Sequence, residues 1–517
     1  MRQGQWTRWW PLAAGAAFVV LLAATNVIPT WPGLIHLVAL PPLDQFTDLR
    51  VLMSRAPSWP AFLILFALVA VARVVLMAWL LGGLDVRRLR CAALFYAVAF
   101  GPVLVAACAD ATAYAVLYAR VFWPALALIT VSMFILGPVP WQGRFRLREA
   151  GAPTWRRGLR IEVTVPYCAV IVTLGAVADR LPVLTVPLVP VSALATGLTI
   201  AMMERSPLRR PRSVLAAFVA VLVAVSIAFV TTRGPDEPEP GPPQTGSLLI
   251  LSGINSASGQ GRIHAMDVHR LGYRCEQVYY FSYAGPGDGQ PQHNATCPIR
   301  TGTPYGPSDT QRPFEEQVDL FAQQASALPR PLVVAAHSHA VWVVWEAVAS
   351  GRVAVDALLL IGPFPSTPTG YPPPHVNEPG RVVGDMMRAA VPVTDLVHLH
   401  FDPETPAARE LLGTVGAAES ILDRPLPATV RAMTLPSVTD LPLASNWHFD
   451  VERNGCPART AHPDLPLSPA FEDAAIRFLN GRPPPPCPPW REWVAVAARP
   501  FGMPRAAATM DRFSYNP

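Results

Sequence analysis

The chain has 517 residues, of which 51% are hydrophobic, so we expect more than one domain. Its formal net charge of +5 is unevenly distributed: residues 1–232 hold 20 arginines against 8 acidic residues, whereas residues 233–517 hold 21 against 28. The basic half is also the apolar half, as expected where arginine-rich loops orient a membrane protein. The acidic half has no basic patch, which argues against a nucleic-acid partner.

Long apolar segments in residues 1–232 predict an α-helical transmembrane domain of about seven spans. A spanning helix needs about 20 mostly apolar residues. The candidate segments are 10–29, 59–82, 91–109, 121–139, 163–178, 182–202 and 214–232. Further spans follow the first segment and no clear small-residue cleavage site precedes a soluble stretch, so we expect it to be retained rather than removed as a signal peptide.

The loop charges predict how this domain is oriented. Four segments are rich in arginine: the N-terminus, 83–90, 140–160 and 203–213. They alternate along the chain with segments that contain few arginines. Seven spans place all four on the cytoplasmic side and the C-terminal half outside. We therefore expect an integral protein of the cell membrane, in contact with the lipid bilayer, whose C-terminal domain is extracytoplasmic.

Arg73 lies near the middle of the second predicted span. A charge at membrane depth is costly, so it marks either a functional site or a structural partner. A structural ion pair or a snorkelling side chain is the favoured interpretation. The alternative is that the spans themselves transport or flip a substrate. Asp110 is expected at the outer end of the third span.

A proline-rich acidic linker, 233–246, separates this domain from a segment in which strand-like and helix-like patterns alternate. The predicted strands are 247–253, 276–285, 331–338, 355–364 and 428–437, and the predicted helices are 264–272, 313–328, 339–351 and 467–481. Such alternation predicts an α/β domain over 247–481, with a mostly parallel sheet and helices on both faces.

Two further segments belong to the C-terminal half. Residues 365–427 form a long insertion, which we interpret as a cap over a binding pocket or as a surface loop. The proline-rich tail, 482–517, contains a short amphipathic segment with tryptophans. This segment either lies on the membrane surface or packs against the soluble domain.

The C-terminal half contains four cysteines, Cys275, Cys297, Cys456 and Cys487. An even number suits two disulfides in an oxidising compartment, and four cysteines allow three connectivities. Neighbourhood along the chain favours the pairs 275–297 and 456–487. No CxxC spacing occurs, so the sequence predicts no zinc site.

The segment Ala336-His337-Ser338-His339-Ala340 joins an apolar strand directly to a helix. In a nucleophile elbow, a serine occupies a strained strand-to-helix turn that lifts its hydroxyl above the sheet. Small residues are needed two positions before and after it because the backbones crowd there. Alanine occupies both places, where glycine is usual. Ser338 is therefore the candidate nucleophile.

With this elbow, residues 247–481 resemble the α/β-hydrolase superfamily, particularly its lipase- and esterase-like members. The resemblance implies the chain order serine, acid, histidine, with the histidine before a final helix. His462 fits this position and His448 is its competitor. Asp440 fits the acid. The other candidate acids are Asp450, Asp395 and Asp402.

The resemblance also implies an oxyanion hole made of two backbone N–H groups. One donor is expected to be the amide of His339, directly after the serine. The other is expected from the loop after the first strand, at Ile254 or Asn255. That loop lacks the His-Gly pair common in the superfamily. The side chains of His337 and His339 are expected to serve in packing rather than as the base.

These features predict a membrane-anchored, extracytoplasmic serine esterase or lipase that acts on an ester or lipid through an acyl-enzyme and needs no cofactor or metal. An acyltransferase would use the same three residues, with an alcohol in place of water. A third hypothesis is a catalytically inactive binding module attached to a transporter or sensor. The alanines of the elbow and the missing His-Gly pair favour it slightly.

Overall fold

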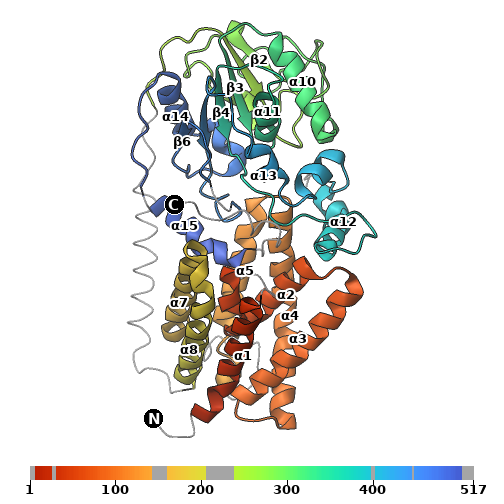
Figure 1. The fold of residues 1–517 in the computed structure, drawn as a ribbon, viewed down its shortest axis with the longest axis vertical. Coiled ribbons are helices and arrows are strands. Elements are labelled where there is room, and N and C mark those ends of the chain that lie inside the picture. Colours follow the sequence, from red (N-terminus) through yellow and green to blue (C-terminus); the bar gives the residue numbers. More distant parts are fainter. Residues whose placement is uncertain are drawn as a thin grey trace.

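The computed structural model has two parts, a bundle of helices and, above it in Figure 1, a domain built on a β-sheet. It describes residues 6–25, 31–142, 160–204, 238–396, 402–444, 447–488 and 490–502. The predicted seventh span, 214–232, lies outside these described residues.

Five helical segments in the bundle are long and apolar enough to cross a membrane. They are α3 (Trp59–Leu80), α4 (Val86–Ala115), α5 (Ala119–Leu136), α7 (Ile161–Arg180) and Pro182–Met203, which comprises η3 (Pro182–Leu184) and α8 (Thr185–Met203). Helix α1 (Trp6–Ala24) contains a shorter apolar stretch. Large apolar side chains such as Leu63, Leu68 and Val71 are exposed, as they would be in contact with lipid tails. The structure thus supports five candidate spans and does not confirm seven.

Between α1 and α3, the chain forms η1 (Pro32–Val38) and α2 (Leu43–Arg55). The sequence predicts no element here. Helix α2 is mostly buried against α3 and α4, although three of its buried side chains are charged, Asp44, Asp48 and Arg50. Buried charges need partners, and those partners come from neighbouring helices.

The sheet contains six parallel strands in the order β2-β1-β3-β4-β5-β6. Their bounds are β1 (Ser247–Leu251), β2 (Val278–Tyr280), β3 (Leu332–His337), β4 (Ala357–Ile361), β5 (Arg431–Leu435) and β6 (Arg453–Asn454). The first five lie within the predicted strands. Strand β6 adds a short edge that the sequence pattern does not reveal. A parallel sheet with helical crossovers is therefore confirmed.

Helices cover both faces of the sheet. Leu249 and Leu251 of β1 belong to the same core as α10 (Phe314–Ser326), α11 (Ala340–Ala349) and α13 (Ala417–Leu422). Leu248 and Ile250 belong to a second core with α14 (Pro469–Leu479). This alternation follows from the two-residue period of a strand.

The prediction of a helix over 264–272 is wrong. A short 3-10 turn, η4 (Arg262–Ala265), is followed by turns. The Asp267 carboxylate accepts the N–H groups of His269 and Arg270, each at 3.1 Å. This local acceptor competes with helical hydrogen bonding and closes a turn instead. Besides η1, η3 and η4, the 3-10 segments of the described chain are η2 (Pro140–Gln142), η5 (Cys275–Gln277), η6 (Pro307–Gln311), η8 (His462–Leu467) and η9 (Arg499–Phe501).

The insertion 365–427 contains α12 (Arg381–Leu396), the π-helical turn η7 (Ala408–Leu412) and α13. Helix α12 packs against α2, α3 and α4 of the bundle. The Trp59 indole N–H donates to Asp385 of α12 at 3.0 Å, and the Gly380 N–H donates to the Ser54 carbonyl at 3.1 Å. The insertion therefore joins the sheet domain to the membrane helices.

Both predicted disulfides, Cys275–Cys297 and Cys456–Cys487, are present. The tail forms α15 (Trp490–Ala498) and η9, which pack against α7. Arg499 pairs with Asp179 at 3.2 Å, and the buried Arg50 donates to the Gly502 carbonyl at 2.6 Å. The tail thus packs against membrane helix α7, whereas the sequence analysis offered only the membrane surface and the soluble domain.

Candidate active site

Ser338 occupies the turn between β3 and α11, at the carboxyl end of a strand in the interior of the sheet. Its φ of +61° lies in the left-handed region, which a residue with a side chain rarely adopts. Its N–H donates to the Ile361 carbonyl of β4 at 2.9 Å, and its own carbonyl accepts the Val341 N–H at 3.0 Å. The turn therefore has the backbone strain and the strand–helix context of a nucleophile elbow.

The backbone around Ser338 is tightly packed. Ala336 and Ala340 are fully buried, so small side chains are required on both sides of the turn. A Cβ atom on Gly253, in the loop after β1, would lie 2.9 Å from the Ser338 Cβ and 3.4 Å from its hydroxyl oxygen. Only glycine allows that loop to pass so close to the serine. Alanine is small enough at the two flanking positions.

Asp440 and His462 form a hydrogen-bonded pair. The His462 Nδ1 lies 2.6 Å from the Asp440 Oδ2, and the aspartate side chain is 7% exposed. Asp440 lies in the turn after β5, and His462 begins η8, immediately before α14. With Nδ1–H donating to the carboxylate, the Nε2 atom is the basic nitrogen of the ring. The pair can orient an imidazole and stabilise its protonated form.

Contacts at the ends of β3 and β4 hold His462 at the same edge of the sheet as Ser338. The His337 Nε2–H donates to the His462 carbonyl at 3.0 Å, and the two rings lie 4.9 Å apart. Phe364 stacks on the imidazole at 5.2 Å. A Cβ atom on Gly362, whose φ is +63°, would lie 2.8 Å from the His462 Cε1.

The contacts of Gly362 and Phe364 with the histidine were not predicted from the sequence. The sequence contained one signal for this close approach, the glycine that ends the apolar run 355–362. Among the residues that the structure describes, the Ser338 hydroxyl forms no hydrogen bond. Catalytic hydrogen bonds are often long without substrate and shorten in the complex, so this geometry is compatible with a serine–histidine contact formed on binding.

The histidines beside Ser338 are buried and uncharged at neutral pH. Burial lowers the pKa of His337 to about 3, an effect to which the neighbouring His462 adds, and burial lowers the pKa of His339 to about 4. The His339 ring packs between Tyr283 and Trp342, with centroids 6.2 and 6.5 Å away. Both side chains are packed in the interior, as expected, and His337 in addition bonds the His462 carbonyl.

Two backbone N–H groups near the elbow have no acceptor within the described chain, those of His339 and Ile254. The third candidate donor, the N–H of Asn255, donates to the Thr310 hydroxyl at 2.9 Å. The Tyr283 hydroxyl donates to the Ser252 carbonyl at 2.7 Å and so anchors the start of this loop. Ile254 is therefore better placed than Asn255 as the second donor.

The competing residues lie in different surroundings. His448 is exposed, with its ring against Trp447 at 3.8 Å, and Asp450 is exposed. The Asp402 carboxylate accepts the Glu404 N–H at 2.8 Å within a turn. The side chain of Asp395 lies outside the described part of the chain.

Membrane helices contact the loop that carries the candidate acid. The Trp123 indole N–H of α5 donates to the Thr439 carbonyl at 3.0 Å, and the Tyr114 hydroxyl of α4 donates to the Pro442 carbonyl at 2.6 Å. These two carbonyls flank Asp440. The edge of the sheet that holds the candidate triad thus faces the helical bundle (Figure 1).

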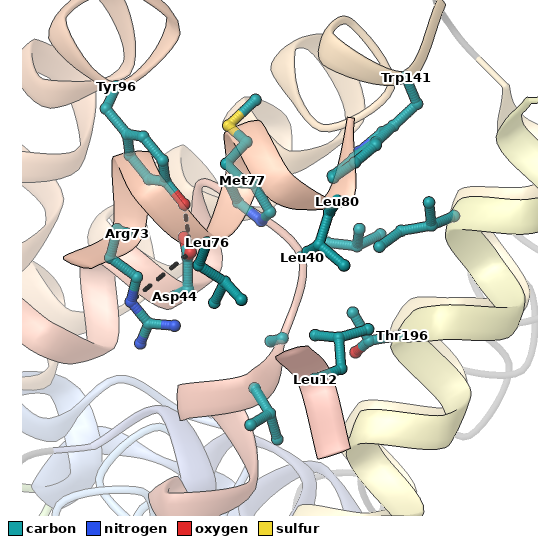
Figure 2. Close-up of a pocket in the computed structure, with 14 residues that line it drawn as sticks. Leu12, Leu40, Asp44, Arg73, Leu76, Met77, Leu80, Tyr96, Trp141 and Thr196 are labelled. Atoms are coloured by element: carbon teal, nitrogen blue, oxygen red, sulfur yellow. Dashed lines mark hydrogen bonds and ion pairs between the residues drawn. The ribbon is translucent and has the colours of Figure 1, made fainter. Parts of the chain in front are cut away.

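A second polar cluster lies inside the bundle (Figure 2). The Arg73 guanidinium bonds Asp48 at 2.7 and 2.8 Å and the Leu37 carbonyl at 2.7 Å, while the Tyr96 hydroxyl donates to Asp44 at 2.6 Å. The adjoining cavity measures about 20 Å³, close to the space of one water molecule. Arg73 is thus a member of a structural ion-pair network, as the favoured interpretation expected.

One group of residues resembles a metal site. His269, Cys275 and Cys297 bring their ligand atoms within 4.8 Å of one another. The two cysteines are joined as a disulfide, so they have no thiolate to offer a metal.

Comparison of the chain with protein-family models, with curated proteins and with solved structures found no match.

Proposed function

We propose that the protein is a membrane-anchored serine hydrolase that cleaves carboxylic esters through an acyl-enzyme on Ser338. The observation that carries the proposal is the strained Ser338 turn at the same sheet edge as the pair formed by the buried Asp440 and the partly buried His462, whose oxygen and nitrogen lie 2.6 Å apart. A serine hydroxyl is a weak nucleophile and needs such an oriented base. A strained serine turn and an oriented imidazole together suit acyl transfer.

In the proposed reaction, the Ser338 oxygen attacks the ester carbonyl while His462 Nε2 takes the serine proton. The negative charge of the tetrahedral intermediate is stabilised by the N–H groups of His339 and Ile254. Collapse of the intermediate breaks the bond to the alcohol, which leaves with the proton from His462. Water, deprotonated by His462, then attacks the acyl-enzyme, and the acid is released as the Ser338 oxygen regains a proton from His462. Asp440 remains ionised and stabilises the imidazolium.

We further propose that the substrate is a lipid or another ester of the cell envelope. The position of the acid loop against Tyr114 and Trp123 supports this, because a substrate must reach a site that faces the membrane helices. The insertion 365–427 also contacts the bundle through α12. A long acyl chain could therefore leave the bilayer without crossing bulk water.

An extracytoplasmic position of the sheet domain is part of the proposal. Contacts with the C-terminal half are made by Trp59 at the start of α3 and by Tyr114 near the end of α4. Because these helices are 22 and 30 residues long, their opposite ends lie about 33 and 45 Å away. The arginine-rich segment 83–90 is at those opposite ends. Basic loops favour the cytoplasm and disulfides favour the outside, so both support this orientation.

The deciding experiment is fluorophosphonate labelling of membranes that contain the wild-type chain, Ser338→Ala, His462→Ala or His448→Ala. We expect labelling of the wild type and of His448→Ala, and none of Ser338→Ala or His462→Ala. Unlabelled wild-type protein that is folded and also inert toward general esters would overturn the enzyme proposal in favour of a binding module. Release of the acyl group to an added alcohol faster than to water would identify an acyltransferase.

A further inference from the structure

A larger cavity lies in the sheet domain, away from the candidate triad. It measures about 490 Å³, within the range of about 300 to 1,000 Å³ typical of small-molecule sites. Its walls include α14, Arg453 of β6, the chain that follows β6 and the proline-rich segment Pro484–Pro488. None of Ser338, Asp440 and His462 lines it.

The walls of this cavity are strongly basic. Four arginines and one acidic residue line it: Arg453, Arg459, Arg477, Arg491 and Asp473. The acid is already engaged, because Asp473 accepts hydrogen bonds of 2.8 and 2.9 Å from Arg477. The lining therefore carries an excess of positive charge that its own carboxylate does not balance.

Arg453, one of the arginines of the lining, has incomplete hydrogen bonding. Its Nη1 atom is buried and has no hydrogen-bond partner among the residues that the structure describes, and its guanidinium lies over the Phe478 ring at 5.4 Å. The neighbouring acid, Glu452, bonds Arg431 instead, at 3.0 Å to two nitrogens. Burial lowers the pKa of Arg453, the negative charge of Glu452 opposes this effect, and repulsion by Arg431 and Arg477 adds to it. A guanidinium with an unpaired donor is stabilised when an acceptor binds to it.

Two other features favour an anion here. The first residues of α14, Pro469 and Ala470, line the cavity, so the positive end of an 11-residue helix dipole adds to the attraction. Arginine side chains bind phosphate oxygens in a bidentate manner, which suits a group with several equivalent oxygens. We propose that this cavity binds the phosphate group of a small phosphate ester or of a lipid headgroup.

The disulfide Cys456–Cys487 connects two walls of the cavity, since Cys456 lines it and Cys487 lies within the proline-rich segment. The other disulfide, Cys275–Cys297, joins segments that do not line the cavity. The shape of the cavity therefore depends on the Cys456–Cys487 disulfide and not on Cys275–Cys297. This inference is independent of the proposed hydrolase reaction.

Calorimetric titration of the detergent-solubilised full chain with glycerol 3-phosphate tests the soluble source. We expect saturable binding that weakens at least about tenfold in Arg453→Gln and is unchanged in Arg482→Gln, an exposed arginine outside the cavity. The paired variant Cys456→Ser/Cys487→Ser is expected to weaken binding, whereas Cys275→Ser/Cys297→Ser is not.

Native mass spectrometry after addition of phosphatidylglycerol or phosphatidylcholine tests the lipid source. Retention of phosphatidylglycerol by the wild type and its loss in Arg453→Gln, with no calorimetric binding of the soluble ester, would assign the site to an anionic lipid headgroup. Equal binding by wild type and Arg453→Gln, or no binding of either probe by the folded wild type, would overturn the proposal.

Discussion

Each half of the molecule contains a buried aspartate bonded to a basic side chain, and the two clusters differ in how many hydrogen-bonding groups of that side chain are still available. In the helical bundle, Asp48 bonds Arg73 through both oxygens, and the adjoining cavity measures about 20 Å³. At the sheet edge, Asp440 bonds one nitrogen of His462, and the other nitrogen lies at the edge that also carries Ser338. An aspartate holds helices together where all three nitrogens of its arginine partner are hydrogen-bonded, and it suits chemistry where one nitrogen of a histidine partner and a nucleophile are left.

The largest expected effect is the loss of activity when the Asp440–His462 pair is altered. Asp440→Asn removes the charge that stabilises the His462 imidazolium, so we expect ester hydrolysis to fall about a thousandfold or more. The exposed Asp450→Asn should stay within about twofold of the wild type. Fluorophosphonate labelling rates of the folded proteins measure both. Equal rates in the two variants would remove Asp440 from the mechanism.

The second-largest expected effect is a loss of folding stability when the Asp48–Arg73 ion pair of the bundle is broken. Asp48→Asn leaves Arg73 buried with only part of its charge balanced, and we expect the free energy of unfolding to fall by about 3–5 kcal/mol. Asp85→Asn breaks an exposed pair with Arg88 and should cost less than about 1 kcal/mol. Thermal unfolding in detergent compares the two. Labelling per folded molecule should be normal in both, and a selective loss of labelling in Asp48→Asn would show that the clusters are coupled.

A third effect concerns the stability of the fold at acidic pH. The pKa of His339 is lowered to about 4 in the folded state, so below about pH 6.5 the unfolded chain binds a proton that the folded chain does not. Stability should therefore fall as the pH drops from 6.5 toward 4, by about 2 kcal/mol at pH 5 for this residue. His339→Phe should show a shallower decline in melting temperature between pH 7 and pH 5. The exposed His375→Asn should keep the full decline, and identical pH dependence in both variants would contradict the assignment.

The smallest effect tests whether the bundle positions the site. Tyr114→Phe removes the hydrogen bond to the Pro442 carbonyl, and we expect kcat to fall about fivefold with KM unchanged, the value of one ordinary hydrogen bond. The matched control is Tyr118→Phe, whose hydroxyl has no hydrogen-bond partner in the described chain. A change in KM without a change in kcat would instead indicate that Tyr114 contacts substrate.

The α/β half was the more predictable from sequence, although not uniformly. Apolar runs such as 331–338 mark buried parallel strands because both faces of the sheet are covered. The two-residue strand β6 has no such pattern, and at 264–272 the Asp267 side chain replaced a predicted helix with a turn. In the bundle, α2 was not predicted because a segment with several charged residues is more typical of a solvent-exposed loop. Only the ion pairs with α3 and α4 explain why it is buried.

By itself, the sequence determined the apolar segments, the strand–serine–helix turn and the order of Ser338, Asp440 and His462, because these depend on local periodicity and chain order. The tertiary structure decided that Asp440 and His462 meet, that Gly253 and Gly362 leave room for the serine and the histidine, and that this edge faces the membrane helices. The reason is physical: such contacts join residues far apart in the chain. Their distances depend on how the sheet and the bundle pack, which no local pattern encodes.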